Sequence, residues 1–454
     1  MEYQRAATAL EFCRTLPKGM LSMSSSPFSL QLLPRSLDPS PVPSSLAVVR
    51  GFRRKLLARP RDLLDYALFL PCIWLVSALG YFFRLGGPLI VLAALAMCIG
   101  YALLRLSAPP KWLGAYVLVC VAAAILSHYR VFPVSWQVHF REQAIARQLA
   151  PVIVFFVMAW ASKAYFERRL PSGDTFDGGD IMIFLGLAIA PVILFQQGFQ
   201  YEYADPLTSM FTMYGSFTNN ITIAMFFLTA GVFLAKGWRR CISIAIILVM
   251  LSLTSLAQFW IVTAGILAVL VGAPGRLIAL GMISTLSLLY LVGFFFIPEV
   301  MSITPNSGIR LVFIVDAFKS VLDTYGAGIG FGTESVRWRY NFPNMPEFTF
   351  LPEPTSMTLD QMLETLSTGV HNSLFQALLR TGLLGFGLLM LALFTVFPGR
   401  NLPRGLRNHA AINFAIMFIS CFVNPALESP VQGIGVGVVY GYLLALRTLT
   451  LPRA

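Results

Sequence analysis

Apolar residues in this chain occur in long runs that are separated by shorter polar turns. Crossing a bilayer as a helix takes about 20 residues, and about twelve of these runs approach that length. They lie at residues 63–83, 87–106, 113–129, 147–166, 181–198, 217–236, 240–257, 259–274, 276–296, 373–397, 409–424 and 431–447. This pattern predicts an all-α, polytopic transmembrane helix bundle. One long polar stretch, residues 297–370, separates the ninth span from the tenth.

The composition agrees with a membrane protein and bounds the number of domains. Hydrophobic residues make up 57% of the chain and charged residues only 12%, whereas soluble domains carry about 25% charged residues. We expect a single transmembrane domain over residues 61–450, because no soluble stretch is long enough to hold a core of its own. Residues 1–60 are rich in Ser and Pro and end in basic residues, which predicts a disordered basic cytoplasmic tail. A start codon assigned too early fits residues 1–60 equally well.

The net charge of +12 is distributed as a topology signal rather than as a nucleic-acid interface. Lys and Arg collect at the cytoplasmic ends of membrane helices, and here they occupy alternate turns in a way that places both termini inside. The inside turns carry Arg105 and Lys111, Arg168 and Arg169, Lys236, Arg239 and Arg240, Arg276, and Arg400, Arg404 and Arg407. The exceptions lie at Arg84 and in the 130–146 loop. This topology places the 297–370 loop outside, and we expect no nucleic-acid partner.

With this topology, the polar residues at the ends of the spans gather on the outer face. They are Gln196, Gln197, Asn219, Asn220, Gln258, His371, Asn372, Asn424 and Glu428. Uncompensated polar groups are costly in hydrocarbon, so such residues usually face a cavity or one another. We therefore expect a polar site that opens outward. Plainer roles also fit: Asn372 as the N-cap of the tenth helix, and Arg380 as a side chain that reaches the membrane surface.

The 297–370 loop contains an amphipathic segment that ends in closely spaced glycines. Its apolar residues recur at helical spacing, at Leu311, Ile314, Phe318 and Leu322. This spacing predicts a helix that begins at Arg310 and lies along the membrane surface. A flexible turn is expected where the glycines follow, at Gly326, Gly328, Gly330 and Gly332. The glycine spacing is not that of a dinucleotide-binding fingerprint, the six cysteines lack metal-ligand spacing, and we expect neither a metal nor a cofactor.

Three short motifs bear on function. The first is His371-Asn372, followed after nine residues by Gly382-Leu383-Leu384-Gly385, and the second is Arg310 with its helix and the Gly-Ile-Gly-Phe-Gly turn at 328–332. The third is Gly215-Ser216-Phe217-Thr218-Asn219-Asn220, at the sixth span. In these motifs the chain resembles the bacterial O-antigen ligase and polymerase superfamily. The resemblance extends over residues 150–445.

The chain departs from the superfamily pattern at two positions. Members commonly carry an arginine just before the Gly-x-Phe motif, where this chain has Met213-Tyr214. Many also carry a Ser-Arg pair after the seventh span, where this chain reads Ser-Leu-Ala-Gln at 255–258. We therefore expect that Arg147 or Arg380 substitutes in binding the donor's phosphates, or that the donor is held in another way.

The resemblance implies a metal-independent glycosyltransferase in the bacterial cytoplasmic (inner) membrane, with its active site facing the periplasm. Its donor would be a glycan on undecaprenyl pyrophosphate, which is transferred to an acceptor hydroxyl. His371 would act as the base, and Arg310 would stabilise the leaving pyrophosphate. The start of the tenth helix would add backbone donors and a favourable dipole. The implied substrate-binding residues are Asn372, Arg380, Asn219, Asn220 and Arg147.

Two activities of the superfamily fit this chain. A polymerase joins repeat units of a surface or exopolysaccharide, whereas an O-antigen ligase attaches the finished glycan to lipid A-core. We favour the polymerase because the ligase-like set of arginines is incomplete. The expected partners are the lipid bilayer, the lipid-linked donor, a glycan or lipid A-core acceptor and, by family analogy, a chain-length regulator and a flippase. A polysaccharide transporter or flippase is the alternative from another class, but we detect no convincing repeat, which such proteins tend to have.

Overall fold

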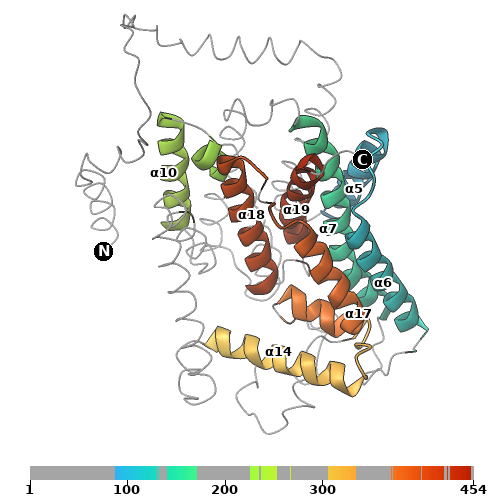
Figure 1. The fold of residues 1–454 in the computed structure, drawn as a ribbon. Coiled ribbons are helices and arrows are strands. Elements are labelled where there is room, and N and C mark those ends of the chain that lie inside the picture. Colours follow the sequence, from blue (N-terminus) through green and yellow to red (C-terminus); the bar gives the residue numbers. More distant parts are fainter. Residues whose placement is uncertain are drawn as a thin grey trace, which may run out of the picture. The chain divides into compact units, whose positions relative to one another are not determined.

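The computed structural model of this chain is built from helices. It describes residues 87–129, 131, 141–170, 225–226, 228–234, 237–252, 266, 305–333, 370, 372–399, 401–423, 427 and 430–450. The helices are α5 (Gly87–Leu104), α6 (Lys111–His128), α7 (Arg141–Arg169), α10 (Trp238–Ser252), α14 (Pro305–Asp323), α17 (Ser373–Thr395), α18 (Arg404–Val423) and α19 (Pro430–Thr450) (Figure 1). No strand occurs among these residues. The all-α prediction is confirmed for this part of the chain.

Three of the helices are long and apolar enough to cross a membrane. They are Lys111–His128, Ala144–Arg169 and Ser373–Thr395. Described helices also overlap the predicted spans at 87–106, 240–257, 409–424 and 431–447. The count of about twelve spans stays a prediction, because 63–83, 181–198 and 276–296 lie outside the described residues. Residues 1–60 and 334–369 lie outside them as well.

Glycines on one face of α19 allow it to pack closely against α7. Gly433, Gly437 and Gly441 follow one another at intervals of four residues, so they share one side of the helix. A Cβ atom on Gly441 would lie 2.5 Å from the Ala159 carbonyl oxygen and 2.6 Å from the Lys163 amide nitrogen. Spacing of this kind lets helix backbones approach each other in membranes, where packing replaces the hydrophobic effect as the driving force.

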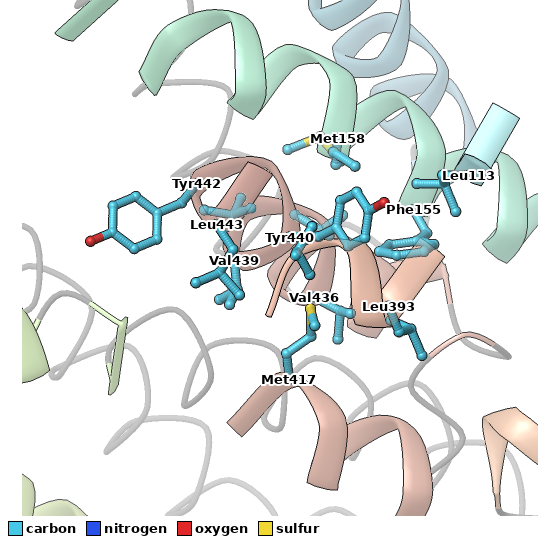
Figure 2. Packing of buried hydrophobic residues seen from close by; sticks show 14 of the residues in the cluster. Leu113, Phe155, Met158, Leu393, Met417, Val436, Val439, Tyr440, Tyr442 and Leu443 are labelled. Carbon is cyan, nitrogen blue, oxygen red and sulfur yellow. The ribbon is translucent and has the colours of Figure 1, made fainter. Parts of the chain in front are cut away.

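Large side chains fill the space on either side of this close contact. Figure 2 shows Tyr440 of α19 beside Phe155 and Met158 of α7. The ring centroids of Phe155 and Tyr440 lie 5.6 Å apart in an edge-to-face arrangement, which is a favourable geometry for aromatic pairs. The Tyr440 hydroxyl donates to the carbonyl oxygen of Ala392, 3.2 Å away. This bond gives the buried phenol a partner and connects α19 to α17.

The loop between α5 and α6 marks one end of this packed unit. The Trp160 indole donates to the Ser107 carbonyl at 2.7 Å, and the Lys163 ammonium donates to the Ala108 carbonyl at 2.6 Å. These bonds hold the loop beside the last turns of α7. The end of α6 and the start of α7 meet at the other end, where His128 Nδ1 lies 3.8 Å from a Glu142 carboxylate oxygen. The loop between α5 and α6 and the last turns of α7, both predicted to lie inside, are therefore at one end of this helix pair. The end of α6 and the start of α7, predicted to lie outside, are at the other.

The packing of α19 on α7 leads to the first prediction. Gly441→Ala places a methyl group against α7 backbone that cannot move alone, and overpacking of this kind costs about 1–3 kcal/mol. We expect a lower thermal unfolding temperature in detergent. Gly100→Ala on α5 is the matched control, because a Cβ atom there meets nothing within 4 Å. Equal unfolding temperatures for the two variants would contradict the packing argument.

Candidate functional site

The glycine-rich segment that follows α14 forms a buried turn. Residues 328–333 are all buried. Four glycines adopt the left-handed backbone region, with φ values of 85°, 80°, 74° and 76° at Gly326, Gly328, Gly330 and Gly332. Residues with a Cβ atom rarely take this conformation. The glycines at alternate positions therefore set the path of the turn that the sequence predicts here.

The tenth predicted span is broken at the first glycine of the Gly-x-x-Gly motif. Gly382 interrupts α17 with φ 64° and ψ −163°, a region that only glycine occupies readily. The break frees backbone groups that a continuous helix would pair. The Leu379 carbonyl accepts from the Ile329 amide at 2.8 Å, and the Leu383 amide donates to the Gly326 carbonyl at 2.9 Å. The turn thus supplies hydrogen bonds that the break removes from α17.

The turn and the break fit together so closely that each requires glycine. A Cβ atom on Gly328 would lie 2.6 Å from the Gly382 amide nitrogen and 2.8 Å from the Leu379 carbonyl oxygen. A Cβ atom on Gly382 would overlap the Gly326 carbonyl oxygen and the Ala327 backbone. We call residues 326–333 together with residues 379–383 the turn–kink unit. Two motifs that are far apart in sequence are therefore one structural feature.

The backbone amides of the turn already donate hydrogen bonds to other groups of the protein. Those of residues 326–332 donate, in order, to Val321 O, Thr324 O, Thr324 Oγ1, Leu379 O, Arg380 O, Ser127 Oγ and Gln148 Oε1. A glycine-rich loop that cradles a phosphate needs amides that point at the ligand. This turn therefore serves to join helices, and any anion bound nearby must be recognised by side chains.

Arg380, predicted from sequence to bind substrate, is directed into the turn. The side chain is 2% exposed. Its Nη1 donates to the Gly330 carbonyl at 3.0 Å and to the Thr333 hydroxyl at 2.8 Å. The Arg380 carbonyl also accepts from the Gly330 amide at 3.1 Å. The residue is thus bound to the turn through its side chain and its backbone, and its role in substrate binding stays a prediction.

Helices α6 and α7 hold the far side of the turn. The Ser127 hydroxyl accepts from the Phe331 amide at 2.8 Å. The Gln148 side chain accepts from the Gly332 amide and donates to the Thr333 carbonyl, both at 2.8 Å. Arg147, a predicted substrate-binding residue, precedes Gln148 in α7. The backbone position of Arg147 therefore lies next to the residue that fixes the end of the turn.

Asn372 is the N-cap of α17. Its side-chain oxygen accepts from the amides of Leu374 and Phe375, at 3.1 and 3.2 Å, and the residue is buried. Two amides at the start of α17 are therefore used within the protein, which leaves fewer backbone donors there than the sequence suggested. His371, Asn219 and Asn220 lie outside the described residues.

Helix α14, which carries Arg310 in its second turn, divides its surface three ways. Asp316 and Ser320 are buried with Ala317 and Val321. An apolar stripe is exposed, formed by Val315, Phe318 and Leu322 at 41%, 48% and 74%. Lys319 and Asp323 are exposed beside it. The exposed surface of the helix thus combines an apolar stripe with charged residues beside it, a combination that suits a helix lying in a membrane interface.

A second buried polar cluster lies away from the turn–kink unit. His409 Nε2 pairs with the Phe226 carbonyl at 3.2 Å, and Nδ1 pairs with the Tyr442 hydroxyl at 2.7 Å. Because a carbonyl only accepts, Nε2 carries the proton and Nδ1 accepts from Tyr442. Asn413 donates to the Thr229 hydroxyl at 3.1 Å. These bonds join α18 and α19 to Phe226 and Thr229, so we assign His409 a structural role.

The described part of the chain contains no group of three or more His, Cys, Asp or Glu residues that could hold a metal ion. The Cys98, Cys120 and Cys421 thiols are buried in the apolar core. Buried cysteines of this kind behave as small hydrophobic residues.

The turn–kink unit generates the second prediction. Gly382→Ala forces a left-handed residue to carry a Cβ atom, which costs about 1–2 kcal/mol before any clash is counted. It also pushes against the Gly326–Ala327 backbone. We expect the amides of residues 329–332 to lose protection in hydrogen exchange. Gly387→Ala, in the same helix, is the control because a Cβ atom there meets nothing within 4 Å. If both variants exchange at the same rate, Gly382 does not hold the turn as described.

The cap at Asn372 generates the third prediction. Asn372→Ala removes the acceptor of two buried amides and should destabilise the folded protein by about 1 kcal/mol. Asn372→Ser retains an oxygen that can cap the helix, so its stability should stay near that of the parent. Thermal unfolding of the purified protein distinguishes the two. If alanine and serine destabilise equally, capping is not the main contribution of Asn372.

Comparison with known proteins adds no relative to this picture. No protein-family model matches the chain, and no curated protein matches it.

Proposed function

We propose that this protein is a membrane glycosyltransferase that uses a glycan on undecaprenyl pyrophosphate as its donor. It transfers the glycan to an acceptor hydroxyl at the outer face of the bacterial cytoplasmic membrane, and so polymerises the repeat units of a surface or exopolysaccharide. One observation carries the proposal: the turn–kink unit joins the Arg310 helix to the helix that follows His371-Asn372. The two motifs that bear the chemistry thus share a rigid backbone frame.

The contacts between α14 and α17 place the beginnings of these two segments, which carry or follow the Arg310 and His371 motifs in the chain, toward the same end. Phe318 packs on Phe375 with ring centroids 5.2 Å apart. Eight residues further along each segment, Gly326 accepts from the Leu383 amide at 2.9 Å. Because both contacts advance in the same chain direction, the beginnings of the two segments lie toward the same end. Arg310 precedes the first contact in α14, and His371 precedes it in the chain that enters α17.

The proposed reaction is a direct displacement at the anomeric carbon of the donor. The acceptor hydroxyl gives its proton to the neutral His371 ring, and its oxygen forms the new glycosidic bond. The bond from the anomeric carbon to the pyrophosphate oxygen breaks, and undecaprenyl pyrophosphate leaves with the bonding electron pair. Arg310 stabilises the charge that develops on the phosphate oxygens through a bidentate contact. One displacement of this kind inverts the anomeric configuration.

The buried and exposed faces of α14 support a donor that is anchored in lipid. An interfacial helix keeps its charged residues at the depth of the headgroups. The pyrophosphate of a prenyl-linked glycan lies at the same depth, where its lipid joins its sugar. A flippase would instead require polar groups near the bilayer midplane. The polar contacts of the turn–kink unit involve Ser127 at the end of α6 and Gln148 near the start of α7.

The fourth prediction tests the transfer reaction in cells. A deletion strain complemented with His371→Ala should produce no polymer, because a positioned base contributes about 10²–10⁴-fold to the rate. Arg310→Ala should be similarly impaired. Arg310→Lys should retain part of the activity, because lysine keeps the positive charge but not the bidentate hydrogen-bonding geometry of the guanidinium. The measurement is the banding pattern of surface glycan and lipopolysaccharide. His128→Ala is the matched histidine control, since His128 is an exposed residue at the end of α6.

The pattern of accumulated material distinguishes the activities. Core that bears a single repeat, or loss of polymer with single units on the carrier, identifies a polymerase. Unsubstituted core with long glycan on the carrier identifies a ligase, for which the acceptor is lipid A-core. Purified protein that moves the lipid-linked glycan across a bilayer without forming a glycosidic bond identifies a flippase. A wild-type pattern in the deletion strain and in both alanine variants would reject glycan transfer.

A further inference from the structure

We propose that Arg380 is a positioning residue that sets the direction of α14 and thereby the location of Arg310. This inference rests on the proposed function and refines it, because the sequence suggested Arg380 as a direct ligand of the donor. The structure instead gives its guanidinium two partners within the turn, Gly330 and Thr333. Arg380 would act on the reaction through the turn and through the helix that precedes it.

The first step is the pair of hydrogen bonds that the Arg380 side chain donates to the turn. One nitrogen, Nη1, donates at 3.0 Å to the Gly330 carbonyl and at 2.8 Å to the Thr333 hydroxyl. These acceptors belong to residues three apart, so the guanidinium bridges the buried half of the turn. Hydrogen bonds from a charged donor are stronger than neutral ones. Gln148 holds the same segment from α7, and the turn is clamped between two helices.

The second step is the choice of residue at this position. Burying a guanidinium in an apolar bundle is costly unless its hydrogen bonds are made. An apolar side chain would fill the same space without that cost, and replacement of buried charge by apolar groups is often neutral for stability. What an apolar side chain would not supply is a bridge between Gly330 and Thr333. The arrangement therefore favours a role in geometry over a role in packing.

The third step is the length of the helix that the turn supports. Arg310 lies thirteen residues before Asp323, the last residue of α14, which corresponds to about 20 Å along the helix. A change of about 5° in helix direction at the turn moves its far end by about 2 Å over that length. Misplacement by about 1 Å can cost a factor of about 10² in rate. A small loosening of the turn thus becomes a large displacement at the arginine.

The structure also separates this role from direct binding. Arg380 is 2% exposed, and it lies in the segment of α17 whose carbonyls accept from the turn. A residue that binds the donor raises KM when removed, because donor affinity falls. A residue that only places Arg310 lowers kcat, because the contact to the leaving group strengthens in the transition state.

The test is a double-mutant cycle on the full-length purified enzyme in nanodiscs, with a lipid-linked repeat unit as donor. Arg380→Met should lower kcat by about 10²-fold with little change in donor KM, and Arg380→Lys should restore part of the rate. In an Arg310→Lys background, the loss caused by Arg380→Met should shrink by about tenfold, since coupled sites are not additive. A merely structural role lowers the yield of folded enzyme and leaves the coupling at zero.

A second pair of variants keeps the test independent of whether Arg380→Met folds. Thr333→Val removes one acceptor of the guanidinium at nearly constant volume, and Thr333→Ser retains it. We expect Thr333→Val to show a smaller kcat loss with the same coupling to Arg310→Lys, and Thr333→Ser to behave as wild type. Thr395→Val, in the other half of α17, is the control for loss of a hydroxyl that donates within its own helix, far from the turn.

The outcomes separate this inference from the proposed function. Equal losses in the wild-type and Arg310→Lys backgrounds overturn the positioning role while transfer itself stands. A rise in donor KM at constant kcat also overturns it, in favour of direct binding. Unchanged transfer by Arg310→Lys and Arg310→Ala removes the assigned role of Arg310, and with it this inference. Reduced kcat with the expected coupling supports both.

Discussion

The close backbone contact between Gly328 and Gly382 is the constraint on which the described site depends. Neither position has room for a Cβ atom, and both have backbone conformations that glycine alone adopts readily. The contact lets the turn supply backbone hydrogen bonds at the break in α17. Breaking a helix inside an apolar bundle is tolerated only where the freed groups find other partners. The turn and the break therefore stabilise each other, and neither would persist alone.

The same contact also decides whether the backbone amides of the turn are available to bind a ligand. A glycine-rich turn beside an arginine and a histidine suggests a phosphate cradle, but the amides of residues 326–332 already have acceptors in the protein. In the proposed function, anion recognition therefore falls to side chains such as that of Arg310. Catalysis by preorganised groups requires that they do not reorganise during the reaction. The turn is held by backbone hydrogen bonds to α17 and by the side chains of Ser127, Gln148 and Arg380, so its position is fixed from three helices.

Much of the helical architecture was accessible from sequence, because hydrophobic runs of the right length predict helices directly. The helix predicted from Arg310, the turn after it and the cap at Asn372 are all found, although α14 begins earlier, at Pro305. The break at Gly382 was not predicted, since the surrounding Leu-rich segment is continuous in hydropathy. Its cause lies about 50 residues away, in the acceptors and donors of the turn. The partners of Arg380 are equally distant in sequence, so no local pattern indicates them.

The orientation of α14 also depends on contacts with residues that are distant in sequence. Apolar periodicity predicts an amphipathic helix along the membrane surface, but it does not indicate that Asp316 and Ser320 are buried while Phe318 and Leu322 are exposed. An exposed apolar stripe of this kind suits contact with lipid. Under the proposed function, Arg310 near the start of this helix would lie close to the headgroup layer. A lipid-linked pyrophosphate diffuses within that layer, so the proposed site would meet its donor by lateral motion in the membrane rather than from solution.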